Sequence, residues 1–181
     1  MSLSACDSTD SNGDADDTPP ETASMSVGDS DVELNAFFAA GEDPETGEEG
    51  FIIYFTESEE LTDETDFQGV STGFIARVGS QPGAGTYAFG NLDIEDDDDL
   101  LEDEFVFVFQ EVEDGEEFPT SIMLSNGGEL TINTSTDSEV TGSFEVDATE
   151  FSFLEGDETD VSVEGTFNAG RIDVFIPGAG F

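Results

Sequence analysis

The sequence contains no histidine, no tryptophan and no lysine, and it has one cysteine, Cys6. Histidine is the commonest general base and a frequent metal ligand, so its absence removes most familiar types of active site. A single cysteine excludes an intramolecular disulfide and argues against a cysteine-based metal site. From these absences we expect a protein that is not an enzyme and that carries no cofactor.

Positive charge is also scarce, because Arg77 and Arg171 are the only basic residues. Against them stand 46 acidic residues, and the formal net charge is −44. Such a chain repels phosphate backbones and anionic lipid surfaces, so we expect no nucleic-acid partner and no membrane contact except through a lipid anchor. Each arginine is expected to bridge several carboxylates and to act as a structural pin.

A high net charge with few apolar residues is typical of disorder, but also of proteins adapted to molar salt. At about 1 M salt the screening length falls to ~3 Å, so neighbouring carboxylates hardly repel one another. The apolar runs Phe51–Phe55 and Phe105–Phe109 favour the second interpretation, and 17 phenylalanines can close a core with few aliphatic residues. Over its whole length the composition resembles that of proteins from haloarchaea and other halophiles that accumulate salt.

The N-terminal residues Leu3-Ser4-Ala5-Cys6 match a lipobox. In bacterial and haloarchaeal lipoproteins, which this segment resembles, the cysteine is lipidated after the signal peptide is removed. Only residues 1–5 precede Cys6, whereas a signal peptide has an apolar stretch of ~7–15 residues before the cleavage site. Two interpretations therefore stay open: a lipobox whose signal peptide lies outside the given sequence, or an ordinary cysteine in a polar tail. Residues 1–30 are expected to form a disordered acidic leash.

From residue 31 to residue 181 short apolar runs alternate with turn residues, as in β-proteins. The expected strands are Val32–Phe38, Phe51–Thr56, Gly73–Val78, Gly85–Phe89, Glu104–Val112, Thr120–Leu124, Glu129–Asn133, Val140–Ala148, Glu150–Leu154, Val161–Asn168 and Arg171–Ile176. Asn126-Gly127-Gly128 predicts a hairpin turn. The sequence therefore predicts one all-β domain, an antiparallel sandwich or barrel of about 8–11 short strands.

The second half of this domain resembles a group of small β-rich lipoproteins of unknown function. The resemblance lies in a G-x-L-x-I strand (Gly128–Ile132) followed by two V-x-G-x-F strands (Val140–Phe144 and Val163–Phe167). It implies a lipocalin-like or sandwich domain and no active site. The glycine that precedes each phenylalanine is expected to mark a bulge or bend in its strand.

The densest group of carboxylates is formed by Asp93, Glu95, Asp96, Asp97, Asp98 and Asp99. We expect a solvated acidic loop, since runs of charge usually face solvent. The alternative is a calcium site, because Ca²⁺ prefers several oxygen ligands. Asn133-Thr134-Ser135 is a sequon and predicts a glycan acceptor at Asn133 in an exported protein.

Together these patterns predict a non-catalytic, salt-adapted lipoprotein domain outside the cell, anchored at the surface. It is expected to bind a small ligand or an envelope partner. One alternative is a structural subunit of a surface assembly, in which the leash or an edge strand adds to a neighbour's sheet, or the apolar end Val174–Phe181 takes part. That end is otherwise expected to be the closing core strand. A second alternative is a calcium-binding protein or a carboxylate-based hydrolase.

Overall fold

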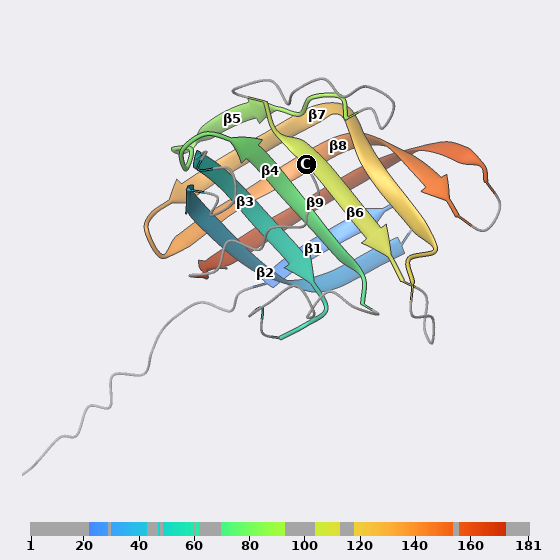
Figure 1. Ribbon diagram of the computed structural model, residues 1–181, viewed down its shortest axis with the longest axis horizontal. Coiled ribbons are helices and arrows are strands. Elements are labelled where there is room, and N and C mark those ends of the chain that lie inside the picture. The colour runs from blue at the N-terminus through green and yellow to red at the C-terminus, as the bar shows by residue number, and fades with distance from the viewer. Residues whose placement is uncertain are drawn as a thin grey trace, which may run out of the picture.

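The computed structural model describes residues 22–28, 30–42, 47, 49–59, 61, 70–92, 104–112, 118–153 and 156–172. In this part of the chain every regular element is a strand (Figure 1). The strands are β1 (Thr22–Val27), β2 (Ser30–Glu42), β3 (Glu49–Thr56), β4 (Thr72–Val78), β5 (Gly85–Ala88), β6 (Val106–Glu111), β7 (Ser121–Ser135), β8 (Glu139–Ser152) and β9 (Glu158–Arg171).

Eight of the strands close into an antiparallel barrel, which confirms the predicted all-β class and decides between barrel and sandwich. The strand order is β7-β6-β4-β3-β2-β1-β9-β8, and β8 pairs again with β7. The wall of β2, β3, β4 and β6 crosses in front of the wall of β7, β8 and β9 (Figure 1). Closure leaves few strand edges open, which limits edge-to-edge association of the sheet.

Two short strands complete the barrel walls. β5 pairs with the second half of β7, whereas β6 pairs with its first half, so both lie on the same edge of β7. β1 lies between β2 and β9. Beyond the start of β1, β2 and β9 pair directly and in parallel at Phe37 and Phe38.

β1 falls inside the range 1–30 for which the sequence predicted only a disordered leash. Ala23 and Met25 of this strand are buried in the core and alternate with exposed Thr22 and Ser24. The segment was missed because its inward residues are few and its outward ones are small and polar. The folded part therefore includes residues from Thr22 onward, and residues 1–21 lie outside the described part of the chain.

Strands β7, β8 and β9 are 15, 14 and 14 residues long, and each replaces shorter strands of the sequence interpretation. Asn126-Gly127-Gly128 is not a hairpin turn: it lies within β7, where the register with β8 shifts between Ser125 and Gly127. Gly128 there has φ = 116°, which glycine adopts readily. Glycine marks both turns and bulges, so the sequence pattern alone did not separate the two.

The same correction applies to the other two long strands. The separate strands predicted at Val140–Ala148 and Glu150–Leu154 form one strand, β8, as far as Ser152. Arg171 ends β9 rather than opening a further strand. The remainder of that predicted strand, residues 173–176, lies outside the described residues.

The bulge in β7 brings Ser125 into the barrel wall, where its side chain is fully buried. The backbone N–H of Phe107 donates to Ser125 Oγ at 3.1 Å, and Ser125 Oγ donates to the Gly90 carbonyl at 2.9 Å. The N–H of Leu92 donates to the Ser125 carbonyl at 2.9 Å. One polar residue thus satisfies the backbone of two other segments, as a buried polar group must.

The barrel interior is filled by one hydrophobic cluster, the inner core. Its phenylalanines are Phe38, Phe51, Phe55, Phe89, Phe105, Phe107, Phe109, Phe144 and Phe167. Phe144 lies among three other rings, with centroid distances of 5.6 Å to Phe55, 5.8 Å to Phe107 and 6.4 Å to Phe167. Aromatic side chains of this size fill a small barrel with few residues.

Glycines opposite phenylalanines make room for these rings. Gly142 pairs in register with Phe167, and Phe144 pairs with Gly165. A Cβ added at Gly165 would lie 2.6 Å from Cζ of Phe144 and 2.8 Å from the Ser24 carbonyl oxygen. One at Gly142 would meet the Thr131 carbonyl oxygen first and would lie 2.7 Å from Cζ of Phe167. At Gly165 the expected bulge was wrong, because β9 runs in register with both β8 and β1 there. At Gly142 β8 is in register with β9, but its register with β7 shifts between Ile132 and Thr134. The two V-x-G-x-F segments thus pack a glycine against a ring in the neighbouring strand.

A second group of buried apolar residues covers the outside of the barrel, and we call it the outer cluster. It consists of Phe37, Ala39, Ile52, Tyr54, Leu61, Ala76 and Val106. Its members on β2, β3 and β4 alternate with the inward residues Phe38, Ile53 and Ile75. The apolar runs seen in the sequence are thus strands that are covered on both faces.

The packing of glycine against ring predicts that Gly165→Ala destabilises the barrel by about 1–3 kcal/mol, because the methyl group overlaps the Phe144 ring and the Ser24 carbonyl oxygen in a tightly packed wall. Gly83→Ala is the matched control, since a Cβ there meets no atom within 4 Å. Urea unfolding in molar KCl measures both. Equal midpoints for the two variants would contradict this packing.

Candidate binding surface on the outer wall

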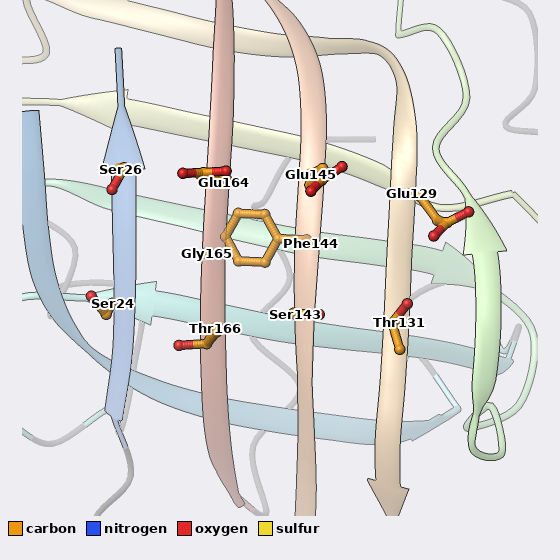
Figure 2. Close-up of a pocket in the computed structure, with 10 residues that line it drawn as sticks. All are labelled: Ser24, Ser26, Glu129, Thr131, Ser143, Phe144, Glu145, Glu164, Gly165 and Thr166. Carbon is orange, nitrogen blue, oxygen red and sulfur yellow. The ribbon is translucent and has the colours of Figure 1, made fainter. Parts of the chain in front are cut away.

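A groove of about 420 Å³ lies on the outer wall formed by β1, β9, β8 and β7 (Figure 2). It is lined by Ser24, Ser26, Glu129, Thr131, Ser143, Phe144, Glu145, Glu164, Gly165 and Thr166. The polar residues of this set occupy the outward positions of their strands, because their neighbours in sequence belong to the inner core. Phe144 and Gly165 form its floor.

The strand register arranges the polar side chains in two parallel rows. In one row Glu129 lies opposite Glu145, and Glu145 lies opposite Glu164. In the other row three neighbouring strands place Thr131, Ser143 and Thr166 side by side, and Ser24 of β1 follows. We call these the carboxylate row and the hydroxyl row.

Both rows continue beyond the groove. The carboxylate row passes from Glu164 to Ser26, which still lines the groove, and then to Asp31 of β2, whose Oδ1 accepts a hydrogen bond from Ser26 Oγ at 2.6 Å. In the hydroxyl row the Oγ1 atoms of Thr86 and Thr131 are 3.4 Å apart. The wall is therefore a polar sheet surface with fixed spacing along and across the strands.

The carboxylate row places like charges directly opposite one another, which destabilises a sheet by a few tenths of a kcal/mol to about 1 kcal/mol per pair when charges are unscreened. Glu129, Glu145 and Glu164 are exposed, so dissolved salt screens them effectively. The wall presents hydrogen-bond acceptors, which fit N–H or O–H donors and hydrated cations.

The structure brings together few of the residues that the sequence singled out. Cys6 and the acidic cluster Asp93 to Asp99 lie outside the described residues, so lipidation and calcium binding stay predictions. Within the described ranges no group of three or more histidine, cysteine, aspartate or glutamate side chains is placed to hold a metal ion. Asn133 is exposed on β7, and its glycosylation stays a prediction.

Both arginines contact aromatic rings at one end of the inner core. The Arg77 guanidinium carbon lies 5.5 Å from the Phe105 ring centroid, and that of Arg171 lies 6.0 Å from the Phe38 ring centroid. Phe51 joins the two rings, with centroids 6.2 Å from Phe38 and 6.3 Å from Phe105. The two cations therefore cover a row of three phenylalanines, an attraction of about 0.5–2 kcal/mol each.

Carbonyl oxygens hold the arginines in these positions. Arg171 donates to the Ala40 carbonyl at 3.2 Å and to the Asp137 carbonyl at 3.4 Å, and Arg77 Nε donates to the Val78 carbonyl at 3.4 Å. Contacts with rings and carbonyl oxygens thus explain how each arginine can act as a structural pin. The expected bridges to several carboxylates stay a prediction.

The sequence interpretation missed the groove, although a signal was present. Each contributing strand carries a short polar alternation, such as Glu129-Leu130-Thr131 and Glu164-Gly165-Thr166. Alternation predicts an outward face for each strand separately. Which residues lie side by side depends on the register between strands, and the bulges in β7 shift that register.

No protein-family model, no curated protein and no solved structure matches this chain. No helix of the described residues is long and apolar enough to span a membrane.

The carboxylate row predicts that Glu145→Gln raises the urea midpoint, because it relieves repulsion from Glu129 and Glu164 on both sides. We expect a gain of a few tenths of a kcal/mol at the lowest salt concentration that still supports folding, and a smaller gain at about 1 M. Asp147→Asn is the control, since Asp147 lies opposite Ser162 and Gly127. The same gain in both variants would contradict the row as the source of repulsion.

Proposed function

We propose that this chain is a non-catalytic, salt-adapted domain of the cell exterior. In this proposal a lipid on Cys6 tethers it to the surface, and the outer wall of β1, β9, β8 and β7 binds an envelope partner. The net charge of −44 supports salt adaptation, since a surface so rich in carboxylates needs concentrated counterions.

The observation that carries the proposal is the packing of the barrel interior. A barrel that carries a small ligand keeps an internal cavity, as lipocalins do. Here the side chains of the inner core occupy that space, with Phe144 in contact with Phe55, Phe107 and Phe167. This packing favours binding at the outer surface and therefore a partner molecule over a small enclosed ligand.

The tether is supported by the sequence between Cys6 and the barrel. Residues 7–21 separate the cysteine from Thr22, the first residue of β1, and are rich in aspartate, serine and threonine. Fifteen residues in extended form reach about 50 Å, enough to hold the barrel clear of a surface.

The alternatives predict different contacts. A structural subunit would use the same outer wall or an exposed strand edge against further copies, and would self-associate as its concentration rises. A calcium-binding protein or a carboxylate-based hydrolase would depend on converging acids. Among the described residues no group of three or more histidine, cysteine, aspartate or glutamate side chains is placed to hold a metal ion, which bears on calcium binding alone.

The experiment is fractionation of cells in molar salt, comparing the natural protein with Cys6→Ser. We expect the natural protein in the envelope fraction, soluble only with detergent and with a lipid mass on Cys6. The variant should be released. A free Cys6 thiol in the native protein would contradict the tether.

The same cells test the binding wall. A photo-reactive amino acid at Ser143, inside the groove, should give a discrete cross-linked product with an envelope component in the anchored protein. Ser138, exposed in the turn between β7 and β8 and outside the groove, is the matched control position. Identical products from the two positions, or none from Ser143, would contradict the proposed wall.

A further inference from the structure

The outer cluster covers a face of the barrel that would otherwise meet water. Its side chains on β2, β3 and β4 are almost fully buried, with Phe37 4%, Ile52 3% and Tyr54 1% exposed. These strands form one wall of the barrel (Figure 1). Their outward side chains can be buried so deeply only if other parts of the chain lie over them.

Three described residues from outside these strands show which parts of the chain reach the outer cluster. Leu61 belongs to the outer cluster, and Leu92 and Ile172 pack against it. Ile172 directly follows β9, and its backbone N–H donates to the Phe38 carbonyl of β2 at 2.9 Å. The chain therefore leaves β9 alongside β2, at the edge of the outer cluster.

The residues that follow have a composition suited to this face. Residues 174–181 read Val-Phe-Ile-Pro-Gly-Ala-Gly-Phe and carry no charged side chain, in a chain of 181 residues with 46 acids. An apolar face free of counterions disfavours an acidic segment, because buried carboxylates lose their hydration. An uncharged apolar segment has no such cost.

We propose that the C-terminal segment docks on the outer cluster of its own barrel through its uncharged residues 174–181, with Asp173 as the link to Ile172, and forms a second layer over β2, β3 and β4. The segment lies outside the described residues, and it is long enough to cross the three strands. Nine extended residues span about 30 Å, whereas three neighbouring strands span about 10 Å between their outer axes.

Position favours this occupant over a second copy of the chain. In dilute salt two chains that each carry a net charge of −44 also repel one another, whereas molar salt screens most of that repulsion. A segment of the same chain is already present at the edge of the face through Ile172. Docking within one molecule also avoids a large exposed apolar patch, which would promote association. The inference does not depend on the proposed function.

The tyrosines provide a direct reporter, because the chain has two tyrosines and no tryptophan. Tyr54 belongs to the outer cluster, whereas Tyr87 packs against the inner core from β5. In Tyr87→Phe all tyrosine fluorescence comes from Tyr54, and in Tyr54→Phe all of it comes from Tyr87. The two variants form a matched pair for two faces of the same barrel.

The experiment ends the chain after Ile172 in both variants and measures quenching by acrylamide in molar KCl. We expect the quenching constant of Tyr54 to rise several-fold on truncation, and that of Tyr87 to stay unchanged. An unchanged Tyr54 in a folded truncated chain would overturn the proposal.

A full-length variant keeps the proposal testable if the truncated chain does not fold. In a Cys6→Ser background, a nitroxide attached at Ala179→Cys should quench the fluorescence of Tyr54, which is read in Tyr87→Phe. It should leave the fluorescence of Tyr87, which is read in Tyr54→Phe, unchanged. Dilution with an excess of unlabelled chain should not change this quenching. Loss of quenching on dilution would place the segment on a second copy of the chain. Equal fluorescence of Tyr54 with and without the nitroxide would show that the segment does not lie on the outer cluster. Either result overturns the proposal.

Discussion

The packing of phenylalanine rings against glycines in neighbouring strands is the constraint on which the barrel depends. Phe144 occupies the space that Gly165 leaves open, and Phe167 occupies the space left by Gly142. The same relation holds between Gly73 of β4 and Phe109 of β6. Each ring fixes the register of two strands, since a shift by one residue would turn it outward and bring a side chain into its place. The closed order of strands and the filled interior follow from this packing.

The core must also hold the barrel together against its own charge. A native domain is stable by only about 5–15 kcal/mol, and 46 carboxylates with two cations impose an opposing repulsion that grows as salt is removed. The carboxylate row on β7, β8 and β9 is a local case of that repulsion. The two arginines contribute through the rings of Phe105 and Phe38, in contacts that rest partly on the apolar stem and the planar group of arginine. Such contacts depend less on ionic strength than exposed ion pairs do.

The sequence predicted the all-β class, because period-two alternation and apolar runs depend on single strands. It predicted the central strands around Phe51–Phe55 and Phe105–Phe109, which the structure confirms as β3 and β6. It did not predict β1, whose inward residues are only Ala23 and Met25. It read the bulge at Gly127 as a turn, and it expected a bulge at Gly165, where β9 runs in register with both neighbours. The sequence did not predict the groove, because the side-by-side placement of Glu129, Glu145 and Glu164 depends on the register between strands.

The measurement that tests this account most directly is circular dichroism of the natural chain, with thermal unfolding, across a salt titration from about 2 M to about 10 mM KCl. At ~10 mM the screening length of ~30 Å exceeds the radius of the domain, so nearly every carboxylate repels every other. We expect a cooperative β-spectrum in molar salt that is lost on dilution and regained when salt is restored. A spectrum and a melting temperature that stay constant over the whole range would contradict it.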